Sequence, residues 1–109
     1  MELRAFRMTL SPGQQAEYRR RHDALWPELG QALAEAGVID YRIYVDSERN
    51  ALFAVMQLAE GHTVDDLPKL PVMRRWWTHM ADIMQTHPDD SPVVVDLEEV
   101  FTFGPGATS

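Results

Sequence analysis

The chain has 109 residues, 45% of them hydrophobic and 25% charged, which is typical of one globular domain with one modest core. Seventeen acidic residues against ten basic ones give a formal net charge of −7, so a nucleic acid duplex or an anionic membrane would be repelled. The absence of cysteine excludes disulfides, thiolate metal sites and a cysteine nucleophile. The N-terminal residues lack the apolar core of a signal peptide, and no apolar run approaches the ~20 residues of a membrane span. We therefore expect a cytoplasmic protein.

The first part of the chain predicts a strand and then a long helix. Residues 3–10 alternate, and the side expected to face the core carries Arg4, Phe6, Met8 and Leu10. Ser11 is a suitable N-cap because Pro12 follows it at the first helical position. The helix is expected over residues 12–36, with a kink at Pro27 and a stop at Gly37.

The second part predicts three more strands and one more helix. Residues 38–46 alternate, with an expected inner side of Ile39, Tyr41, Ile43 and Val45. Residues 51–58 form a more continuously apolar strand, and residues 60–70 read as a loop with at most a short helical turn. Pro71 opens the second helix, whose apolar face is expected to comprise Met73, Trp76, Trp77, Met80, Ile83 and Met84. A long last strand is expected over residues 93–103.

This element order, βαββαβ, predicts an α+β fold, the ferredoxin-like sandwich, in a single domain over residues 1–103. Residues 104–109 read as a flexible C-terminal tail. Several strands carry bulky apolar side chains on both faces, more than a small monomer can bury. We therefore expect a homodimer packed sheet to sheet, which would form a dimeric α+β barrel.

The first candidate site lies on the first helix, where Tyr18, His22 and Trp26 are four residues apart and share a face. An imidazole titrates near neutrality, so His22 could give and take a proton at physiological pH. The alternative is a core histidine bonded to a backbone carbonyl, although Tyr18 would then need a partner of its own. The three arginines at positions 19–21 are expected to form a solvated charged face, from which Arg19 or Arg20 could reach the rim of a pocket.

Trp76 and Trp77 are the second candidate. Adjacent helical residues point about 100° apart, so at most one of them can lie at the centre of the core face. Plain packing explains such a pair, because indoles can dominate a small core. The functional alternative is a sugar platform, in which indole rings stack on a pyranose and Tyr41 adds a hydroxyl to the same cavity.

Other chemistries have little support in the sequence. His62, His79 and His87 lack metal-binding spacing, so we expect no metal. Glu98 and Glu99 would point to opposite faces of a strand, which argues against glycosidase chemistry. There is no glycine-rich phosphate loop, nucleophile elbow or dinucleotide fingerprint, and no cofactor is expected.

Five segments together resemble the L-rhamnose mutarotases, over residues 1 to about 103. They are Tyr18-x3-His22-x3-Trp26-Pro27-Glu28, Asp40-Tyr41-Arg42-Ile43-Tyr44, Arg75-Trp76-Trp77-x2-Met80, Pro88-Asp89-x-Ser91-Pro92 and Leu97-x-Glu99-Val100-Phe101. The resemblance implies a cytoplasmic, metal-free dimeric α+β barrel that interconverts the anomers of L-rhamnose. It also implies that His22 is the proton donor and that Tyr18, Tyr41, Trp76 and Trp77 touch the sugar.

The chemistry agrees with these residues, because opening a hemiacetal requires only proton transfer and no nucleophile, metal or cofactor. Our hypothesis is that His22 serves the ring oxygen as an acid and recovers the proton on closure, with Tyr18 relaying or orienting. Two alternatives remain open. One is a cofactor-independent monooxygenase of the same subunit architecture, and the other is a non-catalytic dimeric module.

Overall fold

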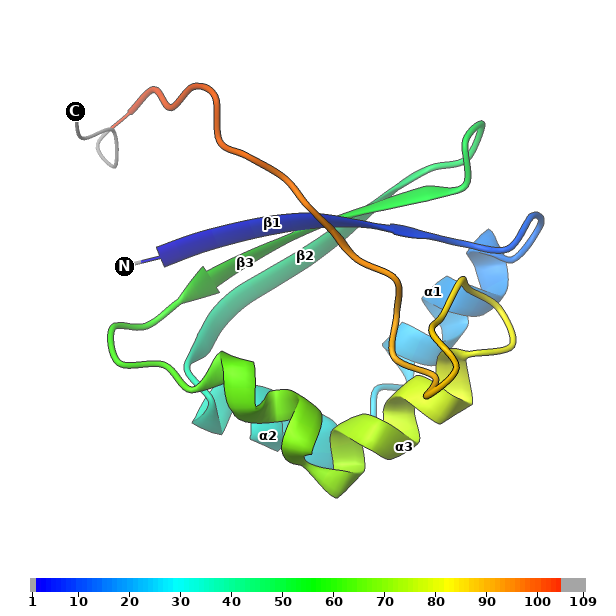
Figure 1. Ribbon diagram of the computed structural model, residues 1–109, viewed down its shortest axis with the longest axis horizontal. Coiled ribbons are helices and arrows are strands. Elements are labelled where there is room, and N and C mark those ends of the chain that lie inside the picture. The colour runs from blue at the N-terminus through cyan, green and yellow to red at the C-terminus, as the bar shows by residue number, and fades with distance from the viewer. Residues whose placement is uncertain (1, 105–109) are drawn as a thin grey trace.

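The computed structural model of the protein describes residues 2–104, and within this range one antiparallel sheet carries helices on one face (Figure 1). The strands follow the spatial order β2-β3-β1-β4. Their bounds are β1 Glu2–Thr9, β2 Val38–Asp46, β3 Ala51–Leu58 and β4 Val95–Asp96. The helices are α1 Gln15–Asp23, α2 Pro27–Glu35, the 3-10 helix η1 Val64–Lys69 and α3 Pro71–Met80. The predicted ferredoxin-like fold is confirmed.

The strands β2 and β3 begin and end at the residues predicted for them. In the adjacent β1, the side predicted to face the core does so, since Met8 is buried there and Leu10, directly after the strand, is buried as well. The inner side of β2 differs at one position, because the register with β3 shifts between Val38 and Asp40. This bulge turns Ile39 outward, where it is 55% exposed, while Val38 packs against the core.

The single kinked helix expected over residues 12–36 is wrong, because the chain forms two helices, α1 and α2, in its place. Trp26 adopts an extended conformation before Pro27, as steric contact with a proline ring requires, and Pro27 then opens α2. The predicted N-cap at Ser11 is also wrong. Gly13 turns the chain with a φ of +78°, so that Gln14 is the N-cap and α1 starts later.

In the second half, α3 begins at Pro71 as predicted but ends at Met80. Ile83 and Met84 are buried after the helix has ended. The long last strand predicted over residues 93–103 is wrong, because only β4 pairs with β1, and the Leu97 amide adds one bond to the Ala5 carbonyl. Beyond this point the chain runs past the sheet with exposed side chains (orange in Figure 1).

The core lies between the helices and the inner face of the sheet. Its main cluster joins Met8, Leu10, Leu52 and Ala54 of the sheet side to Trp76 and Met80 of α3. A smaller cluster of Ala36, Leu58, Val64 and Leu67 closes the end near η1. No helix in the described part of the chain is long and apolar enough to cross a membrane. The proposed boundary between a domain ending at residue 103 and a tail stays a prediction, since residues 105–109 lie outside the described range.

Candidate active site

A cavity of about 670 Å³ lies between the sheet and the helices, and all five residues predicted for the site line it. They are His22, Tyr18, Tyr41, Trp76 and Trp77. Helix α1 supplies the first two, strand β2 supplies Tyr41, and α3 supplies the two indoles. Much of the remaining lining is apolar, with Met8, Leu52, Met73 and Met84 among its side chains. The structure thus brings together residues from three separate parts of the sequence.

His22 is fixed on three sides at the last turn of α1. Its Nδ1 lies 2.9 Å from the backbone carbonyl oxygen of Tyr18. Its ring stacks on the Tyr18 ring at 4.2 Å between centroids, and it meets Trp76 edge to face at 5.4 Å. A carbonyl oxygen only accepts hydrogen bonds, so Nδ1 must carry a hydrogen and Nε2 is left to exchange protons.

The indole wall beside His22 is built by three aromatic contacts on α3. Trp76 is buried, with Trp26 against it at 5.1 Å and nearly perpendicular. Trp26 was predicted on the same helix as His22, but it lies in the link between α1 and α2 and still reaches this wall. His79 contacts both indoles, at 5.4 Å from Trp26 and 5.5 Å from Trp76. Trp77 is only partly buried, and the Arg74 guanidinium lies 5.8 Å from its ring.

Burial shapes the acidity of His22, Tyr18 and Tyr41, three of the titratable residues that line the cavity. It lowers the pKa of His22, opposed by the bond to the Tyr18 carbonyl and by the charge of Asp23. Burial also raises the pKa of Tyr18, and it raises the pKa of Tyr41 to about 12. At neutral pH both phenols therefore keep their protons, while burial favours the neutral form of the His22 ring.

Sequence reasoning missed Arg21, which was placed with its neighbours on a solvated face. The side chain of Arg21 is only 11% exposed and bonds to the end of α3. Arg19, in contrast, lines the cavity, in agreement with the possibility that its side chain reaches the rim of a pocket. Spacing along a helix could not reveal Arg21, because its partner Asp82 is 61 residues away in the sequence.

The described residues contain no group of three or more His, Asp or Glu side chains able to hold a metal ion. His62 instead lies 2.8 Å from a carboxylate oxygen of Glu2, at the edge of the sheet. His79 joins the aromatic wall described above. The polar groups that reach the cavity are suited to hydrogen bonding and proton transfer.

Fold and site together define a ferredoxin-like α+β protein that presents one histidine and two phenols in an aromatic-lined cavity. A family model described as L-rhamnose mutarotase matches residues 4–103. The L-rhamnose mutarotase of Brucella anthropi is 58% identical over 97 residues, which cover 89% of this chain and 92% of the relative. The chain belongs to the L-rhamnose mutarotase family.

Solved structures agree with this assignment. The crystal structure of an L-rhamnose mutarotase from Formosa agariphila matches with a TM-score of 0.89 and 46% identity, over 95% of this chain and all of that one. A dimeric ferredoxin-like protein of unknown function from Jannaschia matches with a TM-score of 0.55 and 19% identity, over 90% of this chain and all of that one. A putative antibiotic biosynthesis monooxygenase from Chloroflexus aurantiacus matches with a TM-score of 0.55 and 13% identity, over 96% of this chain and all of that one. The last two show a shared fold alone.

Proposed function

We propose that the protein interconverts the α and β anomers of L-rhamnose, as an isomerase of the aldose 1-epimerase type. The observation that carries this proposal is the His22 ring, held by Tyr18 and Trp76 at the wall of a cavity of about 670 Å³. Small-molecule sites commonly measure ~300–1,000 Å³, so a pyranose can enter this cavity. The relatives at 46–58% identity, which are named L-rhamnose mutarotases, support the choice of sugar.

The proposed reaction opens the sugar ring and closes it on the other face of the carbonyl. The C1–O5 bond breaks as an imidazolium gives its proton to O5, while the C1 hydroxyl loses its proton to water in the open cavity. Rotation about C1–C2 then presents the opposite face of the aldehyde. On closure O5 attacks C1, its proton returns to the histidine, and O1 regains a proton from water. No electron is transferred and no group leaves, so the reaction needs only acid–base catalysis.

His22 would perform this transfer through Nε2, since Nδ1 is engaged by the Tyr18 carbonyl. That hydrogen bond also fixes the plane of the imidazole ring, so that Nε2 stays available for proton transfer in the cavity. The lowered pKa of His22 makes its imidazolium a stronger acid, although a smaller fraction of rings carries the proton at neutral pH. Help of this kind is worth ~10²–10⁴-fold in rate.

Tyr18, Tyr41, Trp76 and Trp77 would hold the sugar. Their phenols stay protonated at neutral pH because burial raises both pKa values, so they can donate hydrogen bonds to sugar oxygens. The indoles offer flat apolar surfaces for the C–H face of the pyranose. Methionine and leucine side chains in the rest of the lining suit a sugar that ends in a methyl group rather than a hydroxymethyl group.

Saturation-transfer NMR between the anomer signals of L-rhamnose tests the proposal. Wild-type protein should accelerate exchange over buffer, and it should act faster on L-rhamnose than on L-mannose, which differs by a hydroxyl at C6. The His22→Ala variant should accelerate anomer exchange ~10²–10⁴-fold less than the wild-type protein does.

A second variant separates proton transfer from ring placement. His22→Asn can still donate a hydrogen bond to the Tyr18 carbonyl but carries no titratable proton. It should be as slow as His22→Ala. Wild-type exchange in either folded variant would remove His22 from the mechanism.

The same samples address the two alternatives. Oxygen consumption with a quinol, and no effect on sugars, would favour a monooxygenase. A non-catalytic module would change neither the rate of oxygen consumption nor the rate of anomer exchange. The cavity beside the His22 and Trp76 rings favours a ligand-binding role over a sealed structural pair.

We also propose that the protein is a homodimer, packed through the outer face of the sheet. This face exposes Tyr44 opposite Phe53 on neighbouring strands, with Val55 and Val95 nearby in the register. The chain after β4 adds Val100, Phe101 and Phe103, which are between 78% and 91% exposed. Large exposed apolar patches mark interaction surfaces, and sedimentation at twice the chain mass would support the dimer. The cytoplasmic location stays a prediction.

A further inference from the structure

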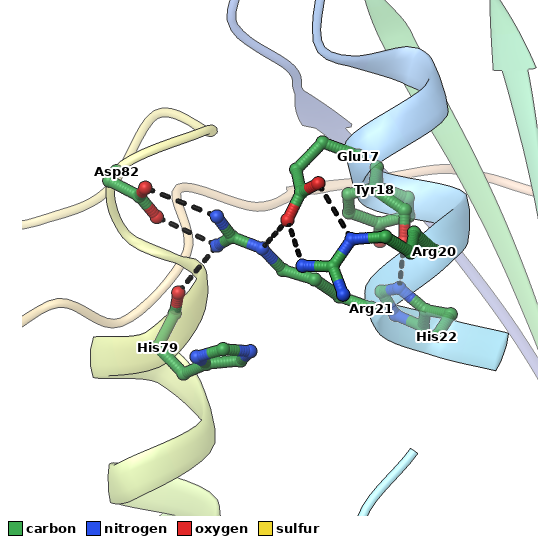
Figure 2. Close-up of polar contacts among 7 residues, drawn as sticks. All are labelled: Glu17, Tyr18, Arg20, Arg21, His22, His79 and Asp82. Atoms are coloured by element: carbon green, nitrogen blue, oxygen red, sulfur yellow. Dashed lines mark hydrogen bonds and ion pairs between the residues drawn. The ribbon is translucent and has the colours of Figure 1, made fainter. Parts of the chain in front are cut away.

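Arg21 joins the two helices that carry the site. Its Nε bonds to Glu17 of its own helix at 2.6 Å, and its Nη1 donates to the backbone carbonyl of His79 at 2.6 Å. Both terminal nitrogens also bond to the Asp82 carboxylate, at 2.7 and 3.2 Å. Figure 2 shows the guanidinium between Glu17 on α1 and the last turn of α3. These contacts are called the Arg21 bridge below.

The attachment point suits a cation for two reasons. The last carbonyls of a helix lack partners within it, and the helix dipole places partial negative charge there. The His79 carbonyl belongs to the last turn of α3, and Asp82 lies two residues after its end. A planar guanidinium can bond to a carboxylate through two nitrogens at once, which a lysine ammonium cannot reproduce.

Apart from the Arg21 bridge, α1 contributes only one buried side chain to the core. It has nine residues, too few for a stable isolated helix, and Tyr18 is its one buried residue. The partly buried Arg21 side chain therefore provides a fixed connection between α1 and α3. His22 follows Arg21 directly and contacts Trp76, one turn before the bridged carbonyl of His79.

The neighbouring Arg20 provides the contrast. It bonds to the same carboxylate of Glu17, at 2.8 and 2.5 Å, but its side chain is 67% exposed. Both of these bonds stay within α1. The two arginines thus carry the same charge and both bond to Glu17, but Arg21 also connects α1 to the end of α3.

We propose that Arg21 is a positioning residue, which holds α1 against the end of α3 so that the His22 ring stays at the edge of Trp76. This inference rests on the proposed role of His22 in mutarotation. Its structural part, the effect on the His22 environment, can be measured without any substrate. A misplacement of ~1 Å in a reacting group can cost ~10²-fold in rate, so a loosened α1 would show in turnover.

The test compares Arg21→Met with Arg20→Met as a matched control. The first readout is the titration of the His22 ring signal in NMR, and the second is kcat and KM for anomer exchange. Arg21→Met should let water reach His22 and so raise its titration midpoint toward that of an exposed histidine. Its kcat should fall ~10–100-fold, while KM changes less than about twofold, because Tyr41 on β2 and the indoles on α3 still bind the sugar. Arg20→Met should match wild type in every value.

The groups that could also influence this titration are the same in all variants. Besides His22, those that line the cavity are Arg4, Tyr18, Arg19, Asp23, Tyr41, Tyr44 and Asp96. His79 contacts the Trp76 ring as well. A change confined to Arg21→Met therefore reports the bridge. Arg21→Lys should give an intermediate loss, because it keeps the charge without the forked contact.

Equal titration midpoints and equal kcat values in folded Arg21→Met and Arg20→Met would overturn the proposal. If Arg21→Met does not fold, Asp82→Asn tests the bridge in its place. The Asp82 side chain is 68% exposed, so its replacement leaves the core packing unchanged. Asp82→Asn should shift the His22 midpoint in the same direction by a smaller amount, and an unchanged midpoint would refute the bridge. If wild-type protein fails to exchange rhamnose anomers, the proposed function fails, while the titration still tests the positioning.

Discussion

The helices α1 and α3 both face the cavity, but different forces hold them in place. Helix α3 buries Val72, Trp76 and Met80, whereas α1 buries Tyr18. The Arg21 bridge connects α1 to its surroundings through charged hydrogen bonds. The wall of the site is thus part of the apolar core, while the helix that carries His22 contributes one buried side chain to that core and is held in addition by charged hydrogen bonds.

This difference suits the chemistry proposed for each helix. A platform for a sugar ring must keep its shape, and close packing provides that. A histidine that exchanges protons with a ligand must stay half-exposed and cannot be sealed in the core. Polar contacts can fix such a residue without covering its ring.

The largest effect on stability is expected from Met80→Ala in α3. The Met80 side chain is 2% exposed, and truncation of a buried methionine costs ~2–5 kcal/mol of unfolding free energy. Chemical denaturation at constant m value measures the loss. A loss below ~1 kcal/mol would show that α3 is not anchored by its apolar face, and the contrast with α1 would fail.

The next prediction concerns the pH dependence of catalysis. Burial lowers the pKa of His22 below its usual 6.5, and the proposed acid must carry its proton in the free enzyme. The value of kcat/KM should therefore fall about tenfold per pH unit above that pKa. Anomer exchange measured from pH 5 to 9, with the buffer rate subtracted, tests this. A rise with pH over the same interval would mean that the neutral ring starts the reaction as a base.

The third prediction is that acid destabilises α1 before it destabilises α3. Hydrogen bonds from Arg20 and Arg21 lower the pKa of Glu17 from 4.5 to about 2, and Arg21 lowers the pKa of Asp82 from 3.8. Because both values are depressed in the folded state, the stabilisation is complete above about pH 4.5 and is lost as the pH falls toward 2. Amide protons of α1 should lose protection from hydrogen exchange in that interval before those of α3. Simultaneous loss in both helices would contradict separate anchoring.

The same contrast explains which features could be predicted from the sequence. Apolar periodicity depends on neighbouring residues, and it located β2, β3 and the start of α3 correctly. The alternation over residues 93–103 indicated which faces would be apolar but could not show whether a neighbouring strand exists there, and only β4 pairs. The missing amide of Pro27 alone predicts a kink in one helix. The extended conformation that the proline ring imposes on Trp26 instead separates α1 from α2.

At the candidate site, the residues with unusual chemistry could be predicted and their polar support could not. His22, Tyr18 and the two tryptophans stand out because such side chains are uncommon together on apolar helix faces. Arg21 lies among three consecutive arginines, and its composition and spacing are those of a solvated face. The burial of its side chain follows from the approach of Asp82, which is a tertiary contact.

The smallest effect is expected from a second arginine that also connects two helices. Arg75 on α3 bonds to Glu28 on α2 at 3.1 and 3.2 Å, but these side chains are 55% and 68% exposed. Exposed ion pairs typically contribute ~0–1 kcal/mol, because water screens them and both side chains lose freedom. Arg75→Met should therefore change the unfolding free energy by less than ~0.5 kcal/mol and leave the His22 titration unchanged. If Arg75→Met shifted that titration as much as Arg21→Met, any cross-helix arginine would serve, and the burial of Arg21 would not explain its role.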